Sequence, residues 1–249
     1  MNESQGIRTP GVLTGEVILG DCIEVMAKRE QESVDLVVTD PPFAIDFNGK
    51  PSNYNRHAGL VLEGYHEVKP VDYRNFTFDW MQEAVRLMKE DASMYVFSGW
   101  NFLEDILFAL RMSGLKVINH VIWKYNFGVY CEKRYVTSHY HLLYVCKNPR
   151  KRKFYSDSRH TNTKNRYHDL EDVWEIKREY WKGEVKTPTK LPTEVVRKCI
   201  EYSSKEGDLV LDPFAGSGQV PHTAMNLHRK YLAIEEAPEF YRFMKDRGL

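Results

Sequence analysis

The chain has 249 residues, 35 basic against 35 acidic residues, and 42% hydrophobic residues. This composition excludes a disordered or fibrous protein and allows one large α/β domain or two small ones. No apolar run approaches the roughly 18 to 20 residues of a membrane span, and the first residues lack a signal-peptide pattern, so we expect a cytoplasmic protein. The four cysteines contain no C-x-x-C pair, so we expect reduced thiols rather than a metal site or disulfides.

Short β-branched and aliphatic runs alternate with segments of helical period, as in parallel sheets whose strands are joined by crossover helices. The pattern predicts strands at residues 16–19, 34–39, 93–98, 116–124, 140–147, 208–211 and 230–234. It predicts helices at residues 22–29, 78–89, 102–112, 193–202, 218–227 and 238–246. The predicted fold is therefore α/β, with a seven-stranded, mostly parallel sheet flanked by helices.

Two long stretches, 48–73 and 148–186, show no clear periodicity. Loops of this length inside a compact domain are usually functional. We therefore predict a single α/β domain over residues 1–249, with an inserted loop at 48–75 and a second insertion at 147–186. The second insertion begins with eight cations and one anion between Lys147 and His168, so binding of a polyanion could be local to it.

The first chemical motif is Asp40-Pro41-Pro42-Phe43, directly after a buried-strand pattern. The prolines stop the strand and hold a carboxylate, a carbonyl and an aromatic ring at its carboxyl end, where open α/β sheets bind ligands. This set suits methylation of an exocyclic amine on a nucleobase: the two oxygens accept the amine hydrogens and the ring stacks on the base. The alternative is a simple turn after a strand.

The second motif, residues 208–218, is a strand followed by a glycine-rich turn and a helix. Gly216 and Gly218 would let a nucleotide-like ligand approach backbone N–H groups near the helix start. The turn is neither a phosphate-binding P-loop nor a complete dinucleotide motif. Glu235, about twenty residues later, is placed to bind ribose hydroxyls, with Glu236 as the neighbouring candidate. Because strand side chains alternate, only one of the two should enter the site; plain packing of the turn is the alternative.

Together, T-D-P-P-F at residues 39–43 and L-D-P-F-A-G-S-G at residues 211–218 resemble the two signature motifs of S-adenosylmethionine-dependent DNA amino-methyltransferases. I-L-G-D-C-I-E at residues 18–24 resembles the segment that precedes the catalytic motif in this family. T-P-T-K-L-P at residues 187–192 resembles its H-P-T-x-K-P segment. The order, with the catalytic motif first, is the circularly permuted order of the β group. The resemblance implies a Rossmann-like class I methyltransferase fold.

The resemblance also implies roles for individual residues. Asp40 and the carbonyl of Pro41, in a motif completed by Pro42, would hold the target amine, and Phe43 would stack on the flipped base. S-adenosylmethionine would be bound by Asp21, Thr189, Asp212, Phe214, Gly216, Gly218 and Glu235. Three departures matter: Thr187 and Leu191 replace the histidine and lysine of the H-P-T-x-K-P segment, and Phe43 replaces the commoner tyrosine.

No Pro-Cys dipeptide occurs, which rules out the covalent cysteine mechanism of ring-carbon cytosine methyltransferases and leaves direct displacement at the sulfonium methyl.

A base inside a duplex cannot enter such a pocket unless it is flipped out, and phosphate contacts would supply most of the affinity. We predict that the second insertion is the target-recognition region, although a solvated basic loop is the alternative. The predicted DNA-binding residues are Arg150, Lys151, Arg152, Lys153, Arg159, Lys164 and Arg166. A second aromatic and basic stretch, 123–135, would line or flank the base pocket.

We therefore expect methylation of adenine N6 in double-stranded DNA, because Asp-Pro-Pro more often marks adenine and Ser-Pro-Pro cytosine in the family. Methylation of cytosine N4 is the closest alternative. RNA or protein-glutamine methyltransferases usually carry the glycine turn first, a nicotinamide dehydrogenase would leave residues 40–43 unexplained, and a silent DNA-binding module would need neither motif intact. The recognition sequence, a partner restriction endonuclease and the oligomeric state stay open, although members of the β group are often homodimers.

Overall fold

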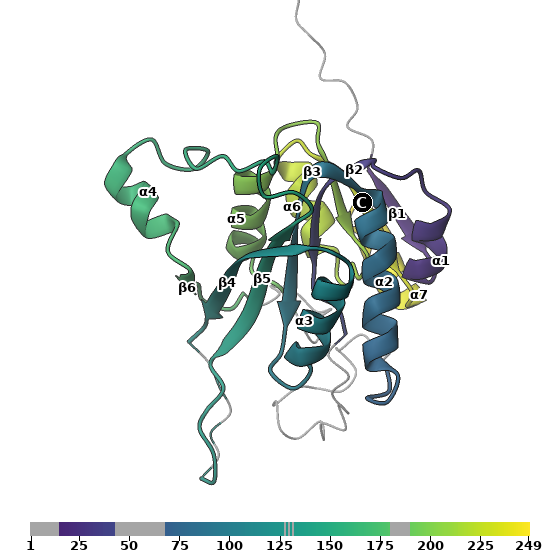
Figure 1. Ribbon diagram of the computed structural model, residues 1–249, viewed down its shortest axis with the longest axis horizontal. Helices are drawn as coiled ribbons and strands as arrows, with labels where there is room; N and C mark the ends of the chain where they lie inside the picture. Colours follow the sequence, from purple (N-terminus) through teal and green to yellow (C-terminus); the bar gives the residue numbers. More distant parts are fainter. Residues whose placement is uncertain (1–14, 43–67, 127, 129, 131, 180–189) are drawn as a thin grey trace, which may run out of the picture.

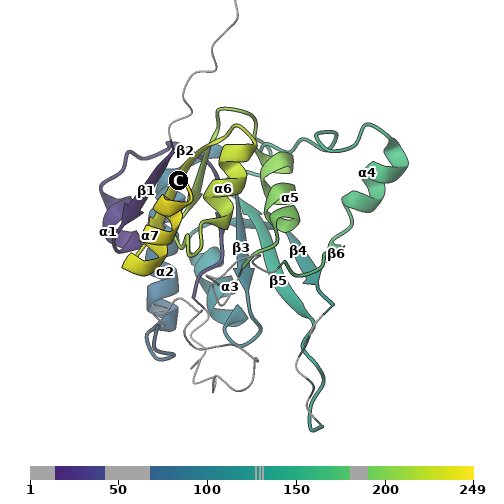
Figure 2. The same ribbon diagram turned by 180° about the vertical axis from the view of Figure 1, so that it is seen from behind.

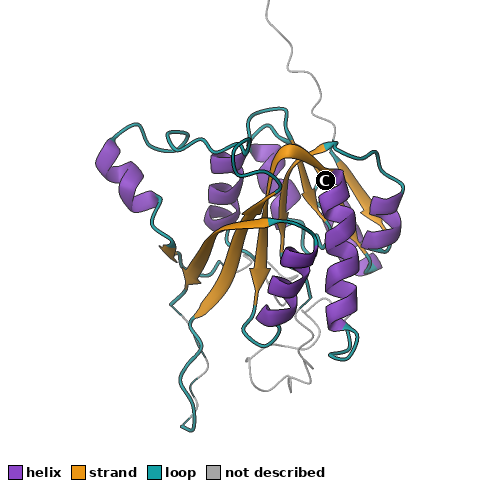
Figure 3. Ribbon diagram, in the orientation of Figure 1, coloured by secondary structure: helices purple, strands orange, loops and turns teal. Residues whose placement is uncertain are grey.

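An eight-stranded sheet with helices on both faces organises the chain in the computed structural model (Figures 1 and 3). The structure describes residues 15–42, 68–126, 128, 130, 132–179 and 190–249. The strands are β1 (Glu16–Leu19), β2 (Val34–Thr39), β3 (Met88–Ser98), β4 (Lys116–Lys124), β5 (His139–Cys146), β6 (Val173–Glu175), β7 (Leu209–Asp212) and β8 (Lys230–Glu235). The helices are α1 (Cys22–Ala27), α2 (Tyr73–Leu87), α3 (Leu103–Met112), α4 (Thr163–Asp169), α5 (Thr193–Ser203), α6 (Gln219–Asn226) and α7 (Pro238–Asp246).

The sheet has the strand order β1-β8-β7-β2-β3-β5-β4-β6. β5 runs antiparallel to β3 and β4, and the other described pairs are parallel. The carboxyl ends of β2, β3, β4, β7 and β8 therefore meet at one edge of the sheet, together with the amino end of β5. This edge carries the β4–β5 hairpin, which projects from the body of the molecule (Figure 1).

The two faces of the sheet are covered by different helices. α1, α2 and α3 pack on one face, and α5, α6 and α7 pack on the other, which Figure 2 shows from behind. All six residues of β2 are buried, as expected for a strand covered on both sides. Leu36 and Val38 pack with the α5 side and Val37 with the α2 side.

The predicted fold class is confirmed, and the differences are local. The sheet has an eighth strand, β6, whose three residues are too few to give a periodic signal. α4 was also absent from the prediction because none of its residues is buried, so it has no apolar stripe. α2 begins at Tyr73 rather than residue 78, and β3 begins at Met88, directly after α2.

The second predicted insertion thus carries both missed elements, α4 and β6. Residues 48–67 of the first insertion lie outside the described residues. Cys22, Cys146 and Cys199 are free and buried, whereas Cys131 lies outside the described part. Within the described ranges, no helix combines the length and the apolar character that crossing a membrane requires.

Candidate active site

A cavity of about 350 Å³ opens at the carboxyl ends of β2, β7 and β8. This volume lies in the range of roughly 300 to 1,000 Å³ that is common for small-molecule sites. The cavity brings together residues from three sequence motifs that are far apart in the chain. The predicted site residues that line it are Asp21, Asp40, Pro42, Asp212, Phe214, Gly216 and Glu235.

The glycine turn after β7 is held by the carboxylate at the end of β8. The backbone N–H of Gly216, at φ +50°, donates to Oε2 of Glu235 over 2.7 Å. The backbone N–H of Ala237 donates to Oε1 of the same carboxylate over 2.9 Å. Each carboxylate oxygen can accept more than one hydrogen bond, so these contacts orient Glu235 and leave capacity for a ligand. Burial raises the pKa of Glu235.

Gly218 lies close to the C-terminal residues of the chain. It precedes α6 at φ +77°, and a Cβ atom there would lie 2.6 Å from Cγ of Met244 and 2.8 Å from Cδ1 of Leu249. Gly218 does not line the cavity. The positive φ and the close approach of Met244 and Leu249 both favour glycine at this position.

Two further acidic residues, Asp21 and Glu236, line the cavity. Asp21 caps α1: its Oδ1 accepts a 2.9 Å hydrogen bond from the backbone N–H of Glu24. Glu236 also lines the cavity, but its side chain is exposed. Both members of the Glu235–Glu236 pair therefore border the cavity, and Glu235 is the one tied into the glycine turn.

Asp40 and Asp212 form the floor of the site as a pair of buried carboxylates. Burial raises the pKa of Asp40 to about 7, against the opposing charge of Arg178. Burial and repulsion by Asp40 and Glu235 raise the pKa of Asp212 to about 8, although Oδ1 of Asp212 accepts a 3.1 Å hydrogen bond from the backbone N–H of Phe214. Oδ1 of Asp40 is buried and has no hydrogen-bond partner within the described residues. Raised carboxylate pKa values in a cavity are typical of functional sites.

Phe214 forms an apolar wall of the cavity. Its ring lies 5.3 Å from that of Trp80, edge to face, and 5.8 Å from that of Phe76. Both partners belong to α2, so the turn after β7 packs against this helix. Trp80 is fully buried.

A group of aromatic residues with one arginine adjoins Asp40 on the α5 side. The guanidinium of Arg178 lies 4.3 Å from the ring centroid of Tyr125 and 5.7 Å from that of Tyr140. Trp123 stacks on Tyr140 with centroids 5.6 Å apart, and its Nε1 donates to the carbonyl of Ile176. The sequence drew attention to residues 123–135, but it did not single out Tyr140 or Arg178.

Two predicted site residues lie outside the described part of the chain, Phe43 of the catalytic motif and Thr189 of the segment before α5. Their roles stay predictions.

The basic segment begins at the opposite edge of the sheet from the cavity. It follows β5, whose last residue, Cys146, pairs with Ser93 near the amino end of the parallel strands. Nζ of Lys153 lies 2.8 Å from Oδ1 of Asp35 in β2 and 3.9 Å from Oδ2 of Asp208 before β7. Lys153 thus binds the amino ends of two strands, and these contacts raise its pKa to about 12.

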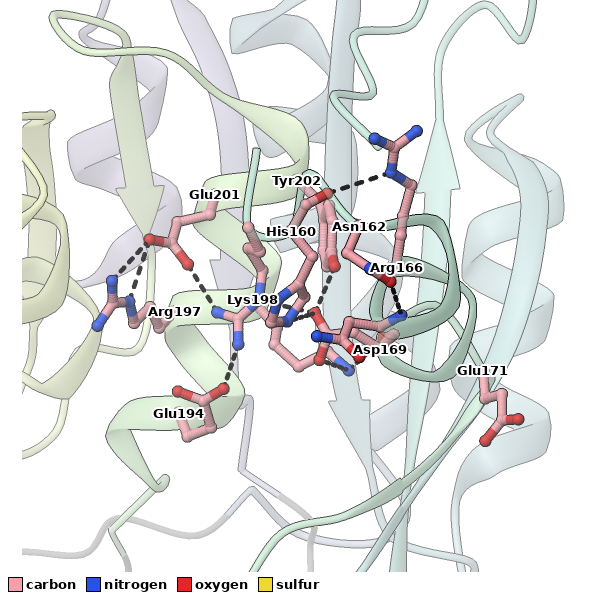
Figure 4. Close-up of polar contacts among 12 residues, drawn as sticks. His160, Asn162, Arg166, Asp169, Glu171, Glu194, Arg197, Lys198, Glu201 and Tyr202 are labelled. Atoms are coloured by element: carbon pink, nitrogen blue, oxygen red, sulfur yellow. Dashed lines mark hydrogen bonds and ion pairs between the residues drawn. The ribbon is translucent and has the colours of Figure 1, made fainter. Parts of the chain in front are cut away.

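Arg159 is also engaged within the protein. Its guanidinium contacts the carboxylates of Asp169, Glu194 and Glu201, and its side chain is only 11% exposed. Figure 4 shows Asp169 beside Lys198 and Tyr202, so α4 is fastened to α5 by charges. These ion pairs are internal contacts that hold α4 and Arg159 against α5.

Of the other five predicted DNA-binding cations, two contact groups within the protein and three are exposed. Arg152 lies over the rings of Tyr144 and Phe154. Arg166 donates to two backbone carbonyls of the same segment, at His160 and Thr161. The exposed members of the set are Arg150, Lys151 and Lys164.

Comparison with known proteins agrees with this site. The family model N6_N4_Mtase, described as DNA methylase, matches residues 34–246. The chain therefore belongs to this family of DNA methyltransferases, of the N6-adenine and N4-cytosine type. This confirms the family expected from the sequence motifs.

Two curated relatives span most of the chain. The type II methyltransferase M.HpaI of Haemophilus parainfluenzae is 27% identical over 241 residues, covering 93% of this chain and 73% of its own. The type II methyltransferase M2.DpnII of Streptococcus pneumoniae is 28% identical over 239 residues, covering 93% of this chain and 88% of its own. Restriction-modification is thus the setting that these names indicate for the relatives.

Two solved structures share the fold. The complex of M1.HpyAVI with S-adenosylmethionine has a TM-score of 0.69 at 22% identity, covering 94% of this chain and 98% of the other. The cytosine-N4-specific PvuII DNA methyltransferase has a TM-score of 0.74 at 19% identity, covering 94% and 86%. At these identities the likeness concerns the fold, which is the class I methyltransferase fold expected from the sequence.

Proposed function

We propose that the chain methylates the exocyclic N6 amine of adenine in double-stranded DNA, with S-adenosylmethionine as the methyl donor. The observation that carries the proposal is the buried Oδ1 of Asp40. It is an acceptor without a partner in the described structure, and it belongs to the cavity that also contains Glu235 and the glycine turn. A buried acceptor of this kind is costly unless a ligand supplies the missing donor.

The cavity residues fit the cofactor by their chemistry. Glu235 offers a fixed carboxylate for ribose hydroxyls, Phe214 offers an apolar wall, and the bend at Gly216 leaves backbone close to the ligand space. Asp21 also lines the cavity and would accept a hydrogen bond from an adenine amine. S-adenosylmethionine, when bound, supplies an electrophilic methyl group.

Asp40 would act on the nucleophile. An exocyclic amine is weakly nucleophilic because its lone pair is delocalised into the ring, and acceptors for its two hydrogens favour a pyramidal nitrogen. In this proposal the Asp40 carboxylate and the Pro41 carbonyl are those acceptors, and the charge of Asp40 stabilises the positive charge that develops during transfer. The ionised form of Asp40 is required, so activity depends on its raised pKa.

Cytosine N4 is the second candidate, supported by the fold shared with the cytosine-N4-specific PvuII enzyme. Adenine is preferred because the motif reads Asp-Pro-Pro rather than Ser-Pro-Pro. A homodimer and a partner restriction endonuclease stay predictions.

Identification of the methylated base tests this proposal. The protein is incubated with duplex DNA of mixed sequence and isotopically labelled S-adenosylmethionine, and the DNA is digested to nucleosides for mass spectrometry. Label in N6-methyldeoxyadenosine is expected. Label in N4-methyldeoxycytidine would replace adenine by cytosine, and unlabelled DNA with normal cofactor binding would overturn the proposal.

A further inference from the structure

Arg178 acts electrostatically on Asp40 and also contacts Tyr140 through its side chain. It follows β6, in the segment where Ile176 donates its backbone N–H to the carbonyl of Lys124. Its guanidinium packs on Tyr125 and Tyr140, and its Nε is buried without a hydrogen-bond partner in the described part of the chain. A half-buried cation with an unpaired donor is costly in a merely structural role.

Nε of Arg178 and Oδ1 of Asp40 lack opposite kinds of hydrogen-bond partner within the described residues. Asp40 has a buried acceptor without a donor, Arg178 has a buried donor without an acceptor, and the two are close enough for Arg178 to lower the pKa of Asp40. A flat ligand that carries an amino group next to a ring nitrogen satisfies both. Adenine has this pair at N6 and N1 and cytosine has it at N4 and N3, whereas thymine has no exocyclic amine.

We infer that Arg178 reads the target base by donating a hydrogen bond to the ring nitrogen next to the amine that Asp40 holds. The inference rests on the proposed function and extends it to base choice. Tyr125 and Tyr140 support the guanidinium, so its plane is fixed before the base arrives. Arginine suits this role because its donors are held in a rigid, planar fork.

The same charge also favours ionised Asp40. The groups that act electrostatically on or through Asp40 are Arg178, Tyr73, Tyr140 and Asp212. Arg178 is the cation among these four, so its removal should raise the pKa of Asp40. The acidic limb of the pH profile should then move to higher pH in Arg178→Met and stay in place in Arg178→Lys.

A substrate with one ring nitrogen removed gives the sharpest test. After the methylated site has been mapped, duplexes carry 1-deazaadenine or 7-deazaadenine at the target position. For the wild-type enzyme, kcat/KM should fall roughly ten- to a hundred-fold on one of the two analogues. Arg178→Met should show a similar fall on adenine and little further loss on that analogue, because the same contact is already absent. The inference would be overturned if the loss from Arg178→Met and the loss from the analogue multiplied when combined. It would also be overturned if the wild-type enzyme were insensitive to both analogues.

Controls separate this inference from folding and from the proposed function. Lys116→Met removes an exposed cation at the edge of the sheet opposite the cavity and should leave kcat/KM unchanged; an equal loss there would also overturn the inference. Arg178→Gln, with unfolding followed by circular dichroism, serves as the second variant if Arg178→Met does not fold. If the wild-type enzyme labels cytosine, the adenine proposal fails, and 3-deazacytosine tests Arg178 in the same way.

Discussion

The backbone N–H of Gly216 donates to the carboxylate of Glu235 over 2.7 Å, joining the loops that follow β7 and β8. The same carboxylate accepts the N–H of Ala237. One side chain therefore shapes the glycine turn and also offers acceptor capacity to a ligand in the cavity. Loss of Glu235 should affect both.

Replacing Glu235 by alanine should weaken binding of S-adenosylmethionine by about 1 to 3 kcal/mol, because a ribose contact and the anchoring of the turn disappear together. Isothermal titration calorimetry measures the change. Glu236→Ala is the matched control, since Glu236 is the exposed neighbour on the same strand end. If Glu236→Ala weakened cofactor binding more than Glu235→Ala did, the ribose contact would belong to Glu236.

Gly218→Ala should destabilise the protein more than Gly114→Ala. Both glycines have φ +77°, but the new Cβ at Gly114 meets no atom within 4 Å, whereas at Gly218 it meets Met244 and Leu249. Backbone strain alone should cost about 1 to 2 kcal/mol at each position. The contact should add about 1 to 3 kcal/mol at Gly218, measured by denaturant unfolding. Equal losses would mean that Met244 moves aside freely.

The salt dependence of DNA binding should distinguish the two edges of the sheet. Lys133 and Arg134 are exposed in the β4–β5 hairpin at the cavity edge, whereas Arg150 and Lys151 are exposed near the opposite edge. Neutralising the hairpin pair should reduce the slope of log K against log salt by about 1 to 2, and neutralising the other pair should change it little. The reverse result would restore the start of the basic segment as the DNA contact predicted from the sequence.

The rate of methyl transfer should fall as the pH drops below about 7. Burial raises the pKa of Asp40 to about 7, so below that pH its carboxyl group is protonated and no longer provides the negative charge. The decrease should approach tenfold for each pH unit in kcat/KM. A profile that stays flat down to pH 5 would show that ionised Asp40 is not required.

Much of the fold could be predicted because its strands are buried and bounded by clear turns. β1, β2, β4 and α7 have the predicted bounds, and the two motifs after β2 and β7 meet at one cavity as expected for parallel strands. α4 escaped prediction because a helix without a buried face has no apolar period. Its position depends on charges instead, such as the pairing of Asp169 with Lys198.

The basic segment shows why composition misleads about contacts. Eight cations in one stretch indicated a polyanion surface, yet the structure pairs Lys153 and Arg159 with carboxylates that come from distant parts of the chain. Such pairing is invisible in a local charge count. Arg178 was missed for the opposite reason, since a single arginine acquires meaning only when β6 brings it beside Asp40.

The central claim is that Asp40 holds the target amine and takes no part in cofactor binding. It is tested most directly by measuring, for Asp40→Ala, both the dissociation constant of S-adenosylmethionine and the single-turnover rate of methyl transfer to DNA at saturating cofactor. The account predicts a dissociation constant within a few-fold of the wild-type value and no detectable transfer. Loss of cofactor binding together with transfer would make Asp40 a structural residue, and retained transfer would place the chemistry elsewhere.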